Sequence, residues 1–229
     1  MSFRFDDAII DICAEKTKFS MQKIKNIILD YGNVIFMIDF LRVRDSFISL
    51  GIKNVDSFFG HRSQDPLFDL FDRGEITAAQ FREGIRMRTG RPDLTDEEID
   101  AAWNTLLIGV PEGKHEVLAY LHKKYRCFLL SNNNEIHYQY CMNHIREKYG
   151  INDNSIFFEK TFYSHLVGLR KPDAAIFQEV VDQTGIVPDE TLFIDDSPQH
   201  LEGAQRLGFR TALCTSEEPL EVLVKKFNL

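Results

Sequence analysis

Short apolar runs that each lead directly into polar residues are the feature that most constrains the fold of this chain. Ile27-Ile28-Leu29 leads into Asp30, Phe128-Leu129-Leu130 into Ser131, and Leu192-Phe193-Ile194 into Asp195-Asp196. Uninterrupted apolar runs of this length, separated by helical patterns, are typical of parallel strands that are buried on both faces. Because strands and helices alternate, we predict an α/β fold with a doubly wound parallel sheet.

The periodicity and the turn residues place the individual elements. We expect strands at residues 25–30, 126–131, 160–163, 191–195 and 210–214. We expect helices at residues 113–124, 135–149, 173–184, 198–207 and 220–227. The order of these elements is that of a sheet with helices on both faces.

The stretch from about residue 40 to residue 108 differs, because no strong strand pattern occurs in it. Thr77 to Gln80 and Thr95 to Glu98 both match the capping box, in which two side chains satisfy each other's free backbone donors at a helix start. We therefore expect a helical cap domain at residues 39–109, inserted into a core formed by residues 21–38 and 110–229. Residues 1–20 are interpreted as an N-terminal extension.

Composition limits the classes of partner. The chain has 229 residues, 44% of them hydrophobic, and a formal net charge of −8, which argues against a nucleic-acid partner because phosphate backbones require clustered Lys and Arg. No apolar stretch approaches the roughly 20 residues of a membrane span. The 4 cysteines lack metal-like spacing, and the acidic N-terminus does not fit a secretory signal. We expect a cytoplasmic protein without a membrane partner, and its oligomeric state stays open.

The polar residues that follow the strands suit phosphate chemistry. In an open parallel sheet, ligands bind outside the carboxyl ends of the strands, so these residues should meet at one edge. Asp30 is a candidate nucleophile, Ser131 and Asn132 precede a helix whose free N–H groups suit phosphate, and Lys171 supplies positive charge. The adjacent acids Asp195 and Asp196 favour a hard cation with oxygen ligands, Mg²⁺.

Each of these residues also fits a structural role when it is considered alone. Asp30 could start a turn, the asparagines could form a cap loop, Lys171 could be a solvated surface residue, and an Asp before Ser197-Pro198 could cap a helix. The combination at one sheet edge is what favours phosphoryl transfer.

Four segments together resemble a known family. Asp30-Tyr31-Gly32-Asn33-Val34, Leu130-Ser131-Asn132, Arg170-Lys171-Pro172 and Ile194-Asp195-Asp196-Ser197 are similar, in this order, to the four motifs of the haloacid dehalogenase-like hydrolase superfamily. The resemblance covers about residues 23–223 and implies a Rossmann-like core with a helical C1-type cap. Asp30 to Ile35, with Ile38-Asp39-Phe40, looks most like bacterial glucose-1-phosphate phosphatase-like members.

The resemblance also implies roles for the motif residues. Asp30 would form an aspartyl-phosphate, Ser131, Asn132 and Lys171 would hold the phosphate, and Lys171 would also take part in catalysis. Mg²⁺ would be bound by Asp30, by the carbonyl of Gly32 and by Asp196, with Asp195 bonded to Lys171 or to metal-bound water. Most phosphatases of the family carry a second Asp at the position of Gly32, as general acid and base.

This departure leaves the source of the proton open. Loss of such a group typically costs about 10²–10⁴-fold in rate, so we expect slow turnover, a good leaving group or a substitute acid. Asp39 is one candidate substitute, and His61 or Arg62 is another. A second departure is His200, where the family usually has Asp or Asn, and we interpret it as a structural histidine.

The sequence thus predicts a Mg²⁺-dependent phosphatase of a small phosphorylated metabolite, such as the sugar phosphate glucose 1-phosphate. One alternative is a 2-haloacid dehalogenase, which also uses an Asp ester and lacks the second Asp but does not need a metal. The other is a catalytically weakened homologue that binds phosphate without turnover.

Overall fold

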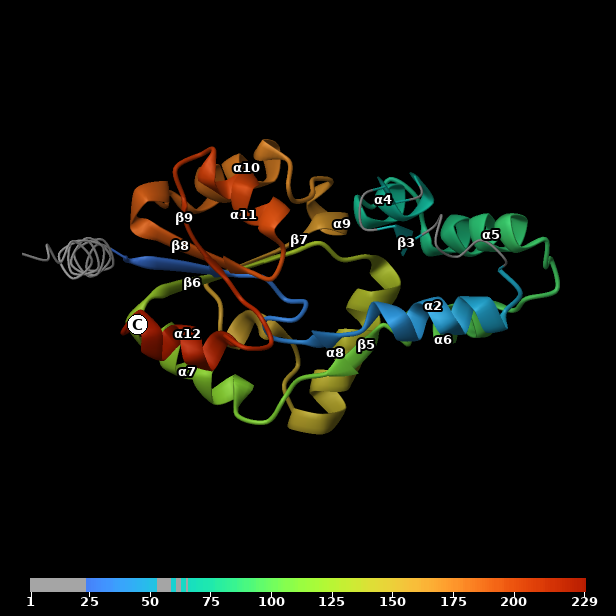
Figure 1. Cartoon of the computed structure of the whole chain (residues 1–229), viewed down its shortest axis with the longest axis horizontal. Coiled ribbons are helices and arrows are strands. Elements are labelled where there is room, and N and C mark those ends of the chain that lie inside the picture. The colour runs from blue at the N-terminus through green and yellow to red at the C-terminus, as the bar shows by residue number, and fades with distance from the viewer. Residues whose placement is uncertain (1–23, 53–58, 61–62, 65) are drawn as a thin grey trace, which may run out of the picture.

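A parallel sheet forms the centre of the molecule in the computed structural model, which describes residues 24–52, 59–60, 63–64 and 66–229. Within these residues the sheet has five strands in the order β7-β6-β1-β8-β9, and all neighbouring pairs are parallel (Figure 1). The strands are β1 (Asn26–Leu29), β6 (Arg126–Ser131), β7 (Lys160–Tyr163), β8 (Thr191–Asp195) and β9 (Arg210–Leu213). The predicted doubly wound α/β fold is confirmed.

Alternating side chains of the buried strands enter separate hydrophobic cores on the two faces of the sheet. Ile28, Phe128 and Phe193 are in register and contribute to one core, together with residues of α10 and α11. Ile27 and Leu29 contribute to the other core. Burial on both faces explains why the strands appear in the sequence as continuous apolar runs.

Helices cover both faces of the sheet, with α10 and α11 on one side and α7, α8 and α12 on the other (Figure 1). Their bounds are α7 (Lys114–Lys124), α8 (Glu135–Tyr149), α9 (Ser164–Val167), α10 (Ala174–Thr184), α11 (Pro198–Gln205) and α12 (Leu220–Lys226), with short 3₁₀ turns at Asn154–Ile156 and Pro188–Glu190. The predicted helices agree with these bounds to within two residues.

A group of helices extends from one end of the sheet (Figure 1). This helical unit consists of α2 (Phe40–Ser49), α4 (Pro66–Asp72), α5 (Ala78–Thr89) and α6 (Asp96–Asn104). The chain enters and leaves it through a short antiparallel pair, β2 (Met37–Ile38) with β5 (Leu107–Gly109), and β3 (Phe59–Gly60) pairs with β4 (Ser63–Gln64). Strands of two or three residues carry too little periodicity to be predicted.

The helix starts in this unit follow from local chemistry. Thr77 and Thr95 each cap a helix and accept from the backbone N–H three residues on, and Gln80 and Glu98 bond back to the capping residue. Both predicted capping boxes are therefore confirmed.

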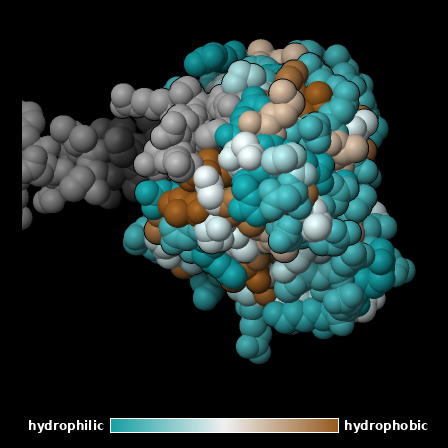
Figure 2. All heavy atoms as spheres, turned by 90° about the vertical axis from the view of Figure 1, so that its right-hand side faces the viewer, coloured by the Kyte–Doolittle hydropathy of each residue, from teal (hydrophilic) through white to brown (hydrophobic). Residues whose placement is uncertain are grey.

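Aromatic side chains fill the interior of the helical unit. Phe71 stacks on Phe81 with ring centroids 4.3 Å apart, and Phe68 lies 5.2 Å from Trp103. All four rings are buried, as expected for an aromatic stripe at helical spacing. The outer end of the unit is mostly hydrophilic, with hydrophobic residues in separate small patches (Figure 2).

Two further expectations concern membranes and cysteines. Within the described ranges, none of the helices combines the length and the apolarity that a bilayer crossing requires. Cys127, Cys141 and Cys214 are buried and free, and burial raises the pKa of the Cys127 thiol to about 12. They pack as small apolar side chains.

Candidate active site

The centre of the sheet brings the sequence-predicted residues together. Leu29 of β1 is in register with Leu129 of β6 on one side and with Ile194 of β8 on the other. The residues that follow therefore meet at the carboxyl edge, where the Asp30 N–H donates to the Ile194 carbonyl at 2.9 Å. The strand order reverses beside β1, which is where ligands bind in open α/β sheets.

Lys171 connects the two acidic motifs. Its Nζ lies 2.6 Å from Asp30 Oδ1 and 2.7 Å from Asp195 Oδ2. The side chain is fully buried, so the interpretation of Lys171 as a solvated surface residue is excluded. A buried ammonium between two carboxylates is stable only because both ion pairs form.

The Asp195-Asp196 pair is held by hydrogen bonds on both sides. The Asp195 carboxylate accepts from the Ser197 N–H at 2.8 Å and lies 2.9 Å from His200 Nδ1. The Asp196 carboxylate accepts from Asn33 Nδ2 at 2.9 Å. Asn33 has a φ of 53°, a left-handed conformation that Asn tolerates better than most residues.

Burial and crowding of negative charge shift the acids unequally. Burial, followed by the charge of Asp195, raises the pKa of Asp30 to about 8 despite Lys171. Burial also raises the pKa of Asp195, but Lys171 and His200 outweigh it and hold the pKa at about 2. Burial raises the pKa of Asp196. The single Lys171 charge thus stabilises Asp195 as an anion but cannot do the same for all three carboxylates.

The donor set fits a divalent cation. Asp30, Asp195 and Asp196 each place a carboxylate oxygen within 4.8 Å of the others, a grouping identified within the part of the chain that the structure describes. Three carboxylates against one ammonium leave an excess of two negative charges, which a bound Mg²⁺ would balance. All the donors are hard oxygens, the ligands that Mg²⁺ prefers.

The loop after β6 supports the lysine. Ser131 ends β6 and is buried, and its Oγ is 3.4 Å from the Asn132 carbonyl. The Asn132 side chain contacts both backbone polar groups of Lys171, since Nδ2 donates to the carbonyl and Oδ1 accepts from the N–H, each at 2.9 Å. The Asn132 amide thus fixes the lysine backbone, and phosphate binding by Ser131 and Asn132 stays a prediction.

Any side chain at position 32 would project toward an aliphatic side chain. A Cβ built on Gly32 would be 3.1 Å from Ile38 Cδ1. The Gly32 carbonyl accepts from the Val34 N–H at 2.7 Å and keeps a second lone pair. Asp39 caps α2 through a 2.8 Å bond from the Leu41 N–H. His61 and Arg62 lie outside the described residues.

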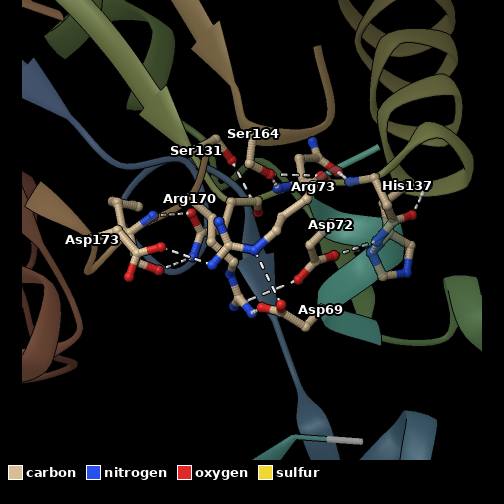
Figure 3. Close-up of polar contacts among 12 residues, drawn as sticks. Asp69, Asp72, Arg73, Ser131, His137, Ser164, Arg170 and Asp173 are labelled. Carbon is tan, nitrogen blue, oxygen red and sulfur yellow. Dashed lines mark hydrogen bonds and ion pairs between the residues drawn. The ribbon is translucent and has the colours of Figure 1, made fainter. Parts of the chain in front are cut away.

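Several residues around the site escaped the sequence reasoning. The contacts of Asn33 with Asp196 and of His200 with Asp195 were not predicted, and the interpretation of His200 as a structural histidine stays a prediction. A charged group between α4 and the segment that carries Lys171 was also missed: Asp69, Asp72, Arg73, Arg170 and Asp173 (Figure 3). Asp69 and Arg73 are a local i,i+4 pair on α4, but no local signal marks the contacts of α4 with Arg170 and Asp173, which lie about a hundred positions away.

Comparisons with known proteins agree with the fold and the motifs. Residues 24–208 match the family model of the haloacid dehalogenase-like hydrolases. The chain is 32% identical over 190 residues to a D-ribitol-5-phosphate phosphatase from Bacteroides thetaiotaomicron, covering 82% of this chain and 90% of that protein.

Solved structures give the same picture. A HAD family enzyme from Bacteroides thetaiotaomicron, an aspartate-to-alanine mutant in complex with magnesium and inorganic phosphate, has a TM-score of 0.82 and 36% identity, covering 87% of this chain and 98% of that one. A HAD-like family hydrolase from Porphyromonas gingivalis has a TM-score of 0.81 and 27% identity, covering 90% and 99%.

Proposed function

Since this chain belongs to the haloacid dehalogenase-like hydrolase family, we propose that it is a Mg²⁺-dependent phosphatase of small phosphorylated metabolites in the cytoplasm. The observation that carries the proposal is the buried Lys171 ammonium between Asp30 and Asp195, beside the third carboxylate of Asp196. The two Bacteroides relatives support it, one being named as a phosphatase and the other binding magnesium and inorganic phosphate.

Asp30 is the proposed nucleophile. One carboxylate oxygen attacks phosphorus, the bond from phosphorus to the alcohol oxygen breaks, and the alcohol leaves after it takes up a proton. Water then attacks the aspartyl-phosphate, releases inorganic phosphate and restores the Asp30 carboxylate. Lys171 neutralises charge on the phosphoryl oxygens and orients Asp30 through their 2.6 Å contact.

Asp30, Asp196 and the Gly32 carbonyl would hold the metal, and Asp195 holds Lys171. Bound Mg²⁺ supplies positive charge that lowers the repulsion between the carboxylate and the anionic phosphate. Asn33 and His200 keep the acidic pair oriented. Ser131, at the end of β6, supplies a hydroxyl for the phosphate.

We assign the helical unit the role of a cap that covers the site, with the cap at residues 39–109 and the core at residues 21–38 and 110–229. The support is that the chain enters and leaves the unit through the β2–β5 pair, at residues 37–38 and 107–109. Because the chain passes between the core and the unit at this pair alone, the unit can select substrates without interrupting the strands of the sheet.

Substrates of two kinds follow from the comparisons and the site. The similarity to a D-ribitol-5-phosphate phosphatase favours phosphorylated sugar alcohols, whose alkoxide leaving group needs a proton. The missing carboxylic acid at Gly32 favours an anomeric phosphate such as glucose 1-phosphate, whose leaving group is better. Turnover of ribitol 5-phosphate would require a proton donor other than residue 32.

A panel of phosphorylated sugars and sugar alcohols, measured by phosphate release with and without Mg²⁺, tests the proposal. Ribitol 5-phosphate, glucose 1-phosphate and p-nitrophenyl phosphate are the diagnostic members, because the last needs no proton on its leaving group. We expect Asp30→Asn to lower kcat by at least about 10³-fold on every active substrate, because the nucleophile is lost. Unchanged melting of that variant shows that the fold is intact, and turnover close to wild type would refute the role of Asp30.

The rival reactions give different results. A 2-haloacid dehalogenase would release chloride from 2-chloropropionate without Mg²⁺. Such a reaction would not need the carboxylates of Asp195 and Asp196 to bind a metal. A binding protein would retain inorganic phosphate but leave p-nitrophenyl phosphate intact after long incubation.

A further inference from the structure

A set of charged side chains joins α4 of the helical unit to the segment that carries Lys171 (Figure 3). We call it the α4 clasp, and it consists of Asp69, Asp72, Arg73, Arg170 and Asp173. Arg73 Nε lies 3.0 Å from Asp69 Oδ2, and its Nη2 lies 2.7 Å from Asp173 Oδ2. Arg170 contacts Asp69 through Nη1, and its Nη2 lies 3.6 Å from Asp72 Oδ2.

The clasp holds the chain on both sides of the buried lysine. Arg170 directly precedes Lys171, and Asp173 follows it by two positions, so α4 contacts the segment before and after the lysine. The Asn132 side chain fixes the Lys171 backbone itself. The lysine side chain then has little freedom in how it reaches Asp30 and Asp195.

One part of the clasp is largely buried. The side chains of Arg170 and Asp72 are 17% and 12% exposed, whereas that of Asp69 is 39% exposed. Asp72 Oδ1 also accepts from Asn134 Nδ2 at 3.2 Å, which ties α4 to the start of α8. Removing Arg170 would leave the Asp72 carboxylate buried without its cation, an unfavourable state that α4 can relieve by moving away.

The clasp also links the helical unit to the phosphate loop. Asn134 caps α8 by accepting from the His137 N–H at 3.1 Å, and it accepts from the Trp103 indole N–H at 3.3 Å. The same short loop carries Ser131 and Asn132. Thus α4 and α6 both contact the loop that leads out of β6.

We propose that Arg170 is a positioning residue, which fixes Lys171 against Asp30 and Asp195 only while α4 is docked on the core. The inference rests on the proposed phosphatase function. Docking of the helical unit thereby completes the charge arrangement, because α4 contacts the residues on both sides of the lysine, Arg170 and Asp173. This role needs a guanidinium that contacts two carboxylates at once. A lysine at this position would make only part of these contacts.

Steady-state kinetics on p-nitrophenyl phosphate with Mg²⁺ tests the inference. We expect Arg170→Ala to lower kcat at least about tenfold with KM changed less than threefold, because a misplaced ammonium weakens transition-state stabilisation more than ground-state binding. Arg170→Lys should recover part of the loss. Asp69→Asn, at a more exposed position that will fold, should lower kcat by a smaller factor in the same direction.

The matched control is Arg126→Ala. Arg126 forms a more exposed ion pair with Glu159, with Nε 2.8 Å from Oε2, at the opposite end of β6. Its kcat should stay within twofold of wild type. Equal kcat for the Arg170→Ala and Arg126→Ala proteins, after correction for the folded fraction, would overturn the inference.

Hydrogen exchange gives a readout that does not depend on turnover. Amides in residues 66–73 and 168–174 should exchange faster in Arg170→Ala than in wild type, and no faster in Arg126→Ala. Unchanged exchange in both segments would also overturn the inference. If wild type hydrolyses no ester, the proposed function fails by itself, and the exchange result separates that failure from a failure of the clasp.

Discussion

Single residues between the helical unit and the core are held by specific hydrogen bonds, and His137 is the clearest example. Its Nε2 lies 3.1 Å from the Trp103 carbonyl, and its Nδ1 lies 3.3 Å from Asn134 Nδ2. These contacts suit a neutral ring that donates from Nε2 and accepts at Nδ1. The ring also stacks on Trp103 with centroids 4.4 Å apart. Burial lowers the pKa of His137 to about 4.

The free energy of unfolding should therefore decrease as the pH is lowered, because His137 takes up a proton when the protein unfolds. Between pH 6.5 and pH 4 the unfolded chain binds a proton at this histidine and the folded protein does not. The contribution of neutral, buried His137 to the free energy of unfolding is therefore fully present above pH 6.5 and is lost on acidification. The slope approaches about 1.4 kcal/mol per pH unit, or about 3 kcal/mol by pH 4. His137→Gln should lower the free energy of unfolding at pH 7 but flatten its pH dependence over this range, as measured by urea unfolding. Parallel curves for the two proteins would contradict the assignment.

Most of the residues that the sequence predicted to converge lie at the end of a strand or directly after it, and Lys171 joins them from a loop. Asp30, Ser131 and Asp195 meet because the carboxyl ends of parallel strands share one edge. Asn33 and His200 could not be assigned to Asp196 and Asp195 in advance, because these contacts depend on the turn that each segment adopts. The same holds for Arg170, whose partners on α4 are distant in sequence.

At the scale of elements, the close approach of α11 to the Lys171 segment depends on a missing side chain. A Cβ at Gly203 would lie 2.5 Å from the Pro172 carbonyl oxygen and 3.1 Å from Phe177 Cε2. The Lys171–Pro172 peptide bond is cis. The backbone next to the lysine therefore packs directly against the helix.

Gly203→Ala should be harmful although it raises helix propensity. The backbone at Pro172 must shift, so we expect about 1–3 kcal/mol of destabilisation, as in other overpacked cores, together with a lower kcat. Gly84→Ala in α5 is the matched control, since its Cβ would be 2.6 Å from Leu67 Cδ1, the end of a flexible side chain. That change should cost less stability and lower kcat by a smaller factor, because the end of the Leu67 side chain can move while the backbone of α4 stays in place. Thermal melting and steady-state kinetics of both variants test this prediction. Equal losses of stability and of kcat in the two variants would contradict the packing argument.

Long elements could be predicted from the sequence and short ones could not. The bounds predicted for β6, β7 and β8 agree with the structure because these strands are buried or follow clear turn signals. The pair β2 and β5 was missed, since each strand has only two or three residues and their pairing spans the whole helical unit. Tertiary contacts, rather than local preference, define such strands.

At the scale of the whole molecule, three carboxylates meet at the carboxyl edge of the sheet. The chain carries a formal net charge of −8, and Asp30, Asp195 and Asp196 share the single ammonium of Lys171. The folded protein gains an arrangement of carboxylates that the unfolded chain lacks. A divalent ion should therefore bind the folded state selectively.

Mg²⁺ should raise the melting temperature as well as support turnover. At a concentration about 100 times Kd, selective binding adds about 2.7 kcal/mol, or roughly 5–10 °C for a chain of this size. Asp196→Asn should lose most of this increment, and NaCl at equal ionic strength should not reproduce it. Differential scanning fluorimetry with Mg²⁺ or EDTA measures the shift, and identical shifts in both proteins would rule out Asp196 as a ligand.

The central place of β1 has a consequence for how the protein is made. Asn26 pairs with Arg126 on one side and with Thr191 on the other, so β1 is synthesised well before either of its partner strands. A nascent chain that stops before Asp195 has its attacking carboxylate but neither of the later acids. Enzymatic competence should then appear in a single step during translation, once β8 and the acids at its end have emerged.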